Sequence, residues 1–198
     1  MNNELTLKII ILGSSKVGKT SLLNQYFNKE FNDTTICTIG IDLQSKFYKF
    51  DNELVKINFI DTAGQERFDS ISGNYLKNVN GVLLVYDISQ QNTFKKIEFW
   101  NEQIKKHNNA YYSVVLIGNK IDLEDCRQVK FEEGIDMGKQ IKCKFYETSA
   151  KNNINVTECF NKIAYLTYKN FLKNGFRSKS FYLKNNKKKE QKNNSKCC

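Results

Sequence analysis

A segment with two glycines follows the first apolar run of the chain. The run extends from Leu7 to Leu12, the segment is Gly13-Ser14-Ser15-Lys16-Val17-Gly18-Lys19-Thr20, and an amphipathic stretch begins at Ser21. A strand, a glycine turn and a helix start are the context of a phosphate-binding loop, because the glycines let the backbone approach an anion and the helix end faces it with amides. Lys19 would then contact the β- and γ-phosphates, and the Thr20 hydroxyl would ligate Mg²⁺. The sequence therefore predicts a nucleotide phosphate site.

An acidic turn follows a later apolar strand. Asp61-Thr62-Ala63-Gly64-Gln65-Glu66 comes directly after the run from Leu54 to Ile60. Because ligands bind at the carboxyl ends of strands in open α/β sheets, we expect Asp61 to lie beside Thr20. From that position its carboxylate can hold Mg²⁺ through water.

Two four-residue motifs indicate which base is bound. Asn119-Lys120-Ile121-Asp122 and Thr148-Ser149-Ala150-Lys151 each follow an apolar strand. The Asp122 carboxylate can accept hydrogen bonds from both N1–H and the 2-amino group of guanine, whereas adenine would leave a desolvated charge unmatched. Backbone amides of the second motif can meet the guanine O6, and the aliphatic stems of Lys120 and Lys151 can sandwich the base. The two motifs together predict guanine specificity.

The elements that must position these residues alternate between strands and helices. Continuous apolar runs predict strands buried on both faces, Asp51-Asn52 predicts a hairpin turn, and a helix over 94–104 is expected to be capped by Asn92 or Thr93. This alternation predicts a doubly wound α/β sheet with ligands at the carboxyl ends of its strands. The expected strands are 7–12, 41–50, 54–60, 81–86, 113–117 and 144–147, and the expected helices are 21–28, 94–104, 131–141 and 156–175.

The composition fits one domain followed by a short tail. The chain has 198 residues, of which 40% are hydrophobic, and a net charge of +10. After Gly175, eight basic residues oppose only Glu190, so +7 of that charge lies at the end of the chain. We expect a domain over residues 1–175 and a disordered basic tail over 176–198. We expect neither a secretory signal nor a membrane-spanning segment, and the six cysteines lack metal-ligand spacing.

The motifs together resemble those of the Ras-like small GTPases, and the resemblance covers about Leu5 to Leu172. It rests on Gly13 to Thr20, Thr38, Asp61 to Gln65, Asn119 to Asp122 and Ser149 to Lys151. Three further stretches are similar to the Rab family in particular: Thr38-Ile39-Gly40-Ile41-Asp42, Ala63-Gly64-Gln65-Glu66-Arg67-Phe68 and Val85-Tyr86-Asp87-Ile88. The resemblance implies a P-loop NTPase fold, with a mostly parallel six-stranded sheet and helices on both faces. It also implies a GDP/GTP switch that hydrolyses GTP slowly and recruits effectors in vesicle-mediated transport.

The resemblance assigns roles to individual residues. Thr38 would complete the Mg²⁺ coordination of Thr20 and Asp61, Gln65 would orient the attacking water, and Lys19 would act with them in catalysis. The Gly64 amide would hold the γ-phosphate and Phe31 would lie against the guanine and ribose. The nucleotide-binding residues it implies are Ser15, Lys16, Val17, Gly18, Lys19, Thr20, Ser21, Phe31, Thr38, Asp61, Gly64, Asn119, Lys120, Asp122, Ser149, Ala150 and Lys151.

The end of the chain resembles a membrane anchor. Cys197-Cys198 follows a Lys-rich stretch, as at the double-geranylgeranylation site of the Rab family. Two lipids, or a lipid and basic residues, are what stable anchoring requires. The resemblance places the protein at the cytoplasmic face of an intracellular membrane, cycling with the cytosol. It implies an exchange factor, a GTPase-activating protein, a GDP-dissociation inhibitor and effectors as partners. Nucleic-acid binding is not expected, because the run from Lys184 to Lys196 lacks interleaved aromatic residues.

Some positions depart from the family pattern. Lys16 stands where Rab proteins usually carry a small residue, and this cation either alters hydrolysis, blocks an activating partner or points to solvent. Leu43, Ile60 and Tyr75 stand at the positions of an exposed aromatic triad, so no named effector is carried over. Two alternatives remain open: a nucleotide-binding scaffold without useful hydrolysis, suggested by Lys16, and an ATP-dependent phosphotransferase, which Asn119 to Asp122 argues against.

Overall fold

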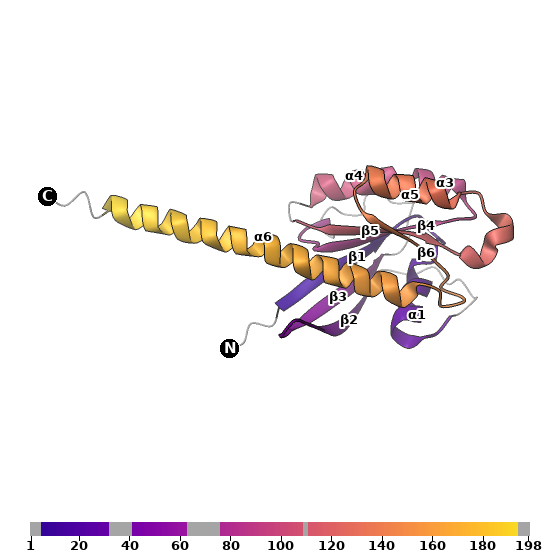
Figure 1. Ribbon diagram of the computed structural model, residues 1–198, viewed down its shortest axis with the longest axis horizontal. Helices are drawn as coiled ribbons and strands as arrows, with labels where there is room; N and C mark the ends of the chain where they lie inside the picture. The colour runs from indigo at the N-terminus through magenta and orange to yellow at the C-terminus, as the bar shows by residue number, and fades with distance from the viewer. Residues whose placement is uncertain (1–4, 32–40, 63–75, 109–110, 194–198) are drawn as a thin grey trace.

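The computed structural model describes residues 5–31, 41–62, 76–108 and 111–193, with side chains up to residue 174. Strands and helices alternate along these segments (Figure 1). The strands are β1 (Leu5–Leu12), β2 (Ile41–Phe50), β3 (Glu53–Thr62), β4 (Gly81–Asp87), β5 (Ser113–Asn119) and β6 (Lys144–Thr148). The helices are α1 (Lys19–Asn28), α3 (Gln91–Lys95), α4 (Ile97–His107), the 3₁₀ helix η1 (Ile121–Cys126), α5 (Phe131–Gln140) and α6 (Val156–Asn193).

The strands form one six-stranded sheet in the order β2-β3-β1-β4-β5-β6. Only β2 and β3 pair in an antiparallel manner, around a turn in which Asp51 has φ 52°, and the other neighbouring pairs are parallel. The predicted mostly parallel sheet and its hairpin are therefore confirmed. The carboxyl ends of β1, β3, β4, β5 and β6 all lie at one edge of the sheet (Figure 1).

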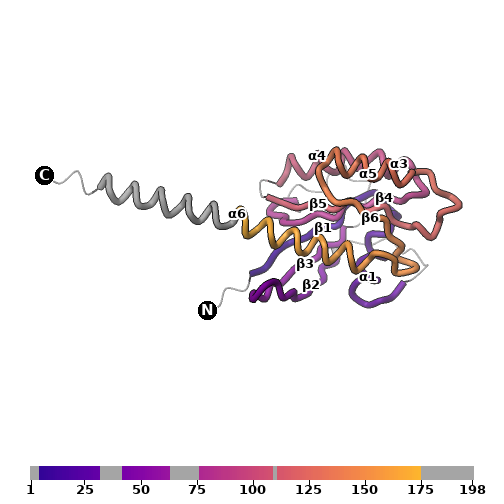
Figure 2. Tube along the Cα trace, in the orientation of Figure 1, coloured from indigo at the N-terminus to yellow at the C-terminus, as the bar shows by residue number. Residues whose placement is uncertain are grey.

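Helices cover both faces of the sheet (Figure 2). The side chains of β1 pack against both helical layers. Leu7, Ile9 and Ile11 pack in one buried cluster with residues of α1 and α6. Ile10 and Leu12 point the other way and pack in a second buried cluster with residues of α3 and α4. Every residue of β4 is buried, as expected for a continuous apolar strand between two helical layers.

The structure divides one predicted helix. The helical spacing of Phe94, Ile97, Trp100 and Ile104 predicted one helix, but α3 and α4 meet at Lys96, which has φ −79° and ψ −6°. The predicted cap at Asn92 or Thr93 is wrong, because α3 begins at Gln91. The Thr93 hydroxyl instead donates to the Gln90 carbonyl oxygen at 2.7 Å and accepts the Asp87 backbone N–H at 3.0 Å. That second bond fixes the start of α3 to the end of β4.

The last helix is longer than its apolar spacing predicted. We expected an end near Gly175, whereas α6 continues to Asn193. Residues 176–193 contain no proline and are rich in lysine, which favours helix almost as strongly as alanine does. No helix in the described part of the chain is both long and apolar enough to cross a membrane.

Candidate functional site

The loop between β1 and α1 has the backbone that its glycines predicted. Gly18 has φ 93°, and a Cβ atom there would lie 2.4 Å from Nδ2 of Asn119. Gly13 has φ 152°, and a Cβ atom there would lie 2.1 Å from the carbonyl oxygen of Val85. Both positions therefore require glycine, because a side chain would collide with the end of β4 or with β5. The loop is pressed against the neighbouring strands at the carboxyl edge of the sheet.

The loop contains one buried cation and one exposed cation. The Lys19 side chain is 4% exposed, and its Nζ donates to the carbonyl oxygens of Gly13 at 2.9 Å and Ser14 at 2.8 Å. Its ammonium group is therefore held by the loop itself. Lys16 is exposed and has φ 62°, a conformation that costs a residue with a Cβ atom about 1 kcal/mol.

A buried carboxylate lies beside the start of α1. The Thr20 hydroxyl donates to Oδ2 of Asp61 at 2.5 Å, joining α1 to the end of β3. Asp61 is buried, and its Oδ1 accepts no hydrogen bond from the residues that the structure describes. Burial raises the pKa of Asp61, although the Thr20 hydroxyl and the Lys19 charge act in the opposite direction. A buried carboxylate oxygen next to a hydroxyl fits a hard divalent cation such as Mg²⁺, which takes oxygen ligands.

Asn119 connects three elements of the site. Its Nδ2 donates to the Val17 carbonyl oxygen at 2.9 Å, and its Oδ1 accepts the Thr148 hydroxyl at 3.0 Å. The side chain is buried, so both bonds are shielded from water. The structure thus brings Asn119 into the site as a link between the phosphate-binding loop, β5 and β6, with both ends of its amide bound to protein.

The residues predicted to recognise the base meet at the same edge. The Ser149 hydroxyl donates to Oδ1 of Asp122 at 2.5 Å and accepts the Asn152 backbone N–H at 3.0 Å. Among the described residues, none donates a hydrogen bond to Oδ2 of Asp122. Ala150 is buried, and the Lys151 side chain is exposed beside them.

Asp87 is a site residue that sequence reasoning missed. It ends β4 and is 1% exposed, and its Oδ2 lies 2.7 Å from Nζ of Lys120. Its Oδ1 accepts the backbone N–H of Ser89 at 2.9 Å and the Ser89 hydroxyl at 2.7 Å. An acidic residue directly after an all-apolar strand was the available signal, because such a carboxylate needs a partner. Asp87 in β4 lies opposite Asn119 in β5, so Lys120, the residue after Asn119, is within reach of the Asp87 carboxylate.

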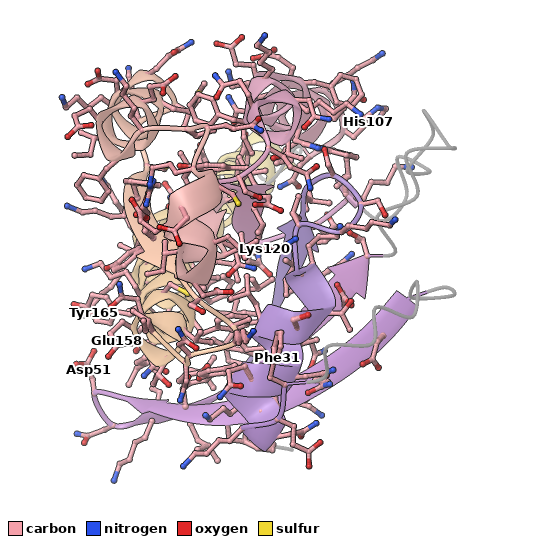
Figure 3. The ribbon with its side chains drawn as sticks, turned by 90° about the vertical axis from the view of Figure 1, so that its right-hand side faces the viewer. Phe31, Asp51, His107, Lys120, Glu158 and Tyr165 are labelled. Carbon is pink, nitrogen blue, oxygen red and sulfur yellow. The ribbon has the colours of Figure 1, made fainter. Side chains whose placement is uncertain are left out.

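The structure also places the remaining predicted residues that it describes. Lys120 and Phe31 lie on the same side of the molecule, in a view onto the carboxyl edge of the sheet (Figure 3). Phe31 is half-buried against the cluster that α1 and α6 form with the sheet. Ser15 and Ser21 are half-buried, and Val17 is buried. Thr38, Gly64, Gln65, Tyr75, Cys197 and Cys198 lie outside the described residues.

The chain is similar to known proteins over most of its length. The sequence model of the Ras family matches residues 8–169. The curated protein "Ras-related protein Rab-11B" of Dictyostelium discoideum is 38% identical over 167 residues, covering 84% of this chain and 76% of that protein. "Ras-related protein Rab-3C" of Bos taurus is 38% identical over 162 residues, covering 82% and 71%. "GTP-binding protein ypt2" of Schizosaccharomyces pombe is 39% identical over 158 residues, covering 80% and 79%.

The matched proteins agree with the arrangement of polar groups at the carboxyl edge of the sheet. Three groups lie along one edge of the sheet. They are the glycine loop with its buried Lys19, the Asp61 carboxylate beside α1, and the pair of Asp122 and Ser149 at the other end. The matched region, residues 8–169, contains every one of these groups. The chain therefore belongs to the Ras family of small GTPases, which bind guanine nucleotides and hydrolyse GTP, and within it to the Rab-like proteins.

Proposed function

We propose that this Rab-like GTPase is a Mg²⁺-dependent, lipid-anchored switch that acts in vesicle-mediated transport at the cytoplasmic face of an intracellular membrane. The observation that carries the nucleotide part of the proposal is the path of hydrogen bonds along the sheet edge. Asn119 binds Val17 in the phosphate loop and Thr148 at the end of β6. The phosphate end and the base end of the site are therefore one connected structure.

Guanine specificity follows from Asp122. Ser149 occupies one oxygen of this carboxylate and fixes its orientation. The other oxygen can accept a donor from the base, and guanine offers N1–H and the 2-amino group on the same edge. Adenine presents an acceptor at N1, so the desolvated charge would be left unmatched at a cost of about 1–3 kcal/mol or more.

Hydrolysis uses residues at the other end of the site. Thr20, Asp61 and Thr38 are the residues that would hold Mg²⁺, which when bound neutralises charge on the β- and γ-phosphates. Lys19 contacts the same phosphates, and the Gly64 amide holds the γ-phosphate. Gln65 orients the water that attacks. Loss of the γ-phosphate then releases the segments that contain Thr38 and Gly64, which is what makes the protein a switch.

The proposed partners follow from the family and the end of the chain. Cys197 and Cys198 carry the lipids, and the basic residues after Gly175 add attraction to anionic headgroups of about 1 kcal/mol each near the surface. An exchange factor, a GTPase-activating protein and a GDP-dissociation inhibitor control the cycle between membrane and cytosol. Effectors bind the GTP form. Leu43 is exposed where an aromatic residue is usual, which supports effectors that differ from the usual ones, whereas Ile60 packs in the core.

A change of base specificity tests the proposed recognition of guanine by Asp122. In Asp122→Asn the side chain loses its charge and presents an amide, so GTP affinity should fall about 100-fold or more. Xanthosine triphosphate has a carbonyl in place of the 2-amino group, and the introduced amide can donate to that oxygen, so xanthosine binding should rise. Asp125→Asn makes the same charge change at an exposed position of η1 and should alter neither affinity. Unchanged GTP affinity in Asp122→Asn would refute the proposal.

A further inference from the structure

We infer that Arg127 is a positioning residue for guanine recognition: it clamps η1 to β6 and so holds Asp122 at the place where the base is recognised. The inference rests on the proposed role of Asp122 and adds a residue that the sequence motifs do not contain. Asp122 lies on η1, whereas Ser149, which orients it, follows β6. Something must fix the separation of these two segments.

Arg127 makes that connection with both sides of its guanidinium group. Nη1 and Nη2 donate to the two carboxylate oxygens of Glu147 on β6, at 2.6 and 2.9 Å. Nε and Nη2 donate to the two oxygens of Glu124 on η1, at 2.8 and 2.7 Å. Nη1 also donates to the Val129 carbonyl oxygen at 2.9 Å. The planar fork of arginine is suited to such paired contacts, and lysine cannot reproduce them.

Burial shows which half of the clamp is the stronger one. The side chains of Arg127 and Glu147 are 18% and 12% exposed, whereas that of Glu124 is 64% exposed. Both carboxylates raise the pKa of Arg127, with the Glu147 bond as the largest cause. Because exposed ion pairs contribute little, the bond to Glu147 is the one that holds η1 to the sheet.

The 3₁₀ helix η1 has little intrinsic stability of its own. It spans six residues, starts from Lys120 at φ 72°, and contains Leu123 at the non-helical φ −100° and ψ 39°. Short 3₁₀ segments have poor hydrogen-bond geometry and depend on contacts with the rest of the protein. Lys120 is held at one end by Asp87 and Arg127 at the other by Glu147. Asp122 lies between these two anchors.

The β6 side of the clamp leads directly into the site. Glu147 is followed by Thr148, which donates to Asn119, and by Ser149, which donates to Asp122. A displacement of η1 from Glu147 would therefore lengthen the Ser149–Asp122 contact first. The bonds of Lys19 to Gly13 and of Thr20 to Asp61, at the other end of the site, belong to other elements and would remain.

A comparison of GTP with inosine triphosphate distinguishes a role of Arg127 in positioning Asp122 from a general effect on protein stability. It lacks only the 2-amino group, so wild-type protein should bind GTP about tenfold or more tightly than inosine triphosphate, as one charge-assisted hydrogen bond predicts. In Arg127→Ala the ratio of the two affinities should fall by about threefold or more, because a displaced Asp122 no longer binds the extra donor. The measurement is displacement of labelled GDP by each nucleotide in the presence of Mg²⁺.

Three further variants test whether the contact between Arg127 and Glu147 positions Asp122. Glu147→Gln should lower the same ratio, and Arg127→Ala/Glu147→Gln should add nothing further, because both changes break one contact. Glu132→Gln makes the same charge change at an exposed position of α5 and is the matched control, so its ratio should stay at the wild-type value. An unchanged ratio in both Arg127→Ala and Glu147→Gln, with both nucleotides weakened equally, would show a structural role only and overturn the inference. A wild-type ratio near one would instead refute the role proposed for Asp122.

Discussion

The side-chain amide of Asn119 donates to the backbone carbonyl oxygen of Val17 at 2.9 Å, across 102 positions of the chain. The bond joins the end of β5 to the tightest part of the phosphate-binding loop. It also places Nδ2 of Asn119 directly over Gly18, where a Cβ atom would lie 2.4 Å from it. The shape of the loop and the orientation of β5 are therefore set by the same contact.

Gly18→Ala should abolish tight nucleotide binding. The new Cβ would be strained at φ 93° and would displace Asn119, breaking its bond to Val17. We expect affinity for GDP and GTP to fall by about 100-fold, measured by release of labelled GDP. Gly138→Ala on α5 is the control, because its Cβ would lie 3.3 Å from Cβ of Phe145 and no positive φ is involved. Equal effects at the two glycines would contradict this explanation.

Gln65→Leu tests whether the protein hydrolyses GTP in the proposed way. The leucine cannot orient a water molecule, so single-turnover hydrolysis should slow by about tenfold or more while GTP affinity stays the same. Gln140→Leu, at an exposed position of α5, should have the wild-type rate. If Gln65→Leu and the wild type hydrolyse GTP at equal rates, Gln65 has no part in the mechanism and the non-hydrolysing scaffold becomes the better description.

Membrane attachment should depend on the final two residues. Replacing both Cys197 and Cys198 by serine should move the protein from membranes to the cytosol in eukaryotic cells and leave GTP binding unchanged. Replacing one of them should give intermediate attachment, because a single lipid binds membranes only marginally. Cys126→Ser, at an exposed position of the domain, is the control for cysteine loss. Fractionation that still finds the double variant on membranes would disprove the anchor.

The thiol of Cys143 gives a pH-dependent prediction. Burial raises its pKa from an ordinary 9.0 to about 11. The thiolate is the reactive form, so alkylation by iodoacetamide at pH 8 should be slow at Cys143 and faster at exposed Cys126, as peptide mass spectrometry can measure. Because folding favours the protonated thiol, the stability it contributes is complete below pH 9 and is lost between pH 9 and about 11. Cys143→Ser should remove that part of the pH dependence of unfolding.

Sequence reasoning succeeded where the signal was local or followed a general rule of folds. The continuous apolar run of β4 indicates burial by itself, and the rule that ligand-binding residues gather at the carboxyl ends of strands was enough to place Asp61 beside Thr20. The break at Lys96 was missed because Phe94 and Ile97 keep helical spacing across it. The spacing of apolar residues shows which side chains are buried, but it does not show whether the helix is continuous.

Contacts that depend on strand register or on the path of a loop could not be predicted from one sequence. The pairing of Asp87 with Lys120 depends on the register between β4 and β5, and the contact of Arg127 with Glu147 depends on how η1 returns to β6. The continuation of α6 beyond Gly175 was missed for a different reason. It follows from the helix propensity of polar residues, which an apolar repeat does not report.

The ion pair between the buried Asp87 and the half-buried Lys120 has a consequence for how a purine would be distinguished. Since the ammonium charge is paired with the buried Asp87 carboxylate, the methylene stem of Lys120 would meet the ring of a bound base as a hydrocarbon surface under the proposed function. Such a surface attracts every purine to nearly the same degree. Discrimination would then fall to Asp122 and to the backbone amides that follow β6, so that stacking strength and base identity could be altered separately by mutation.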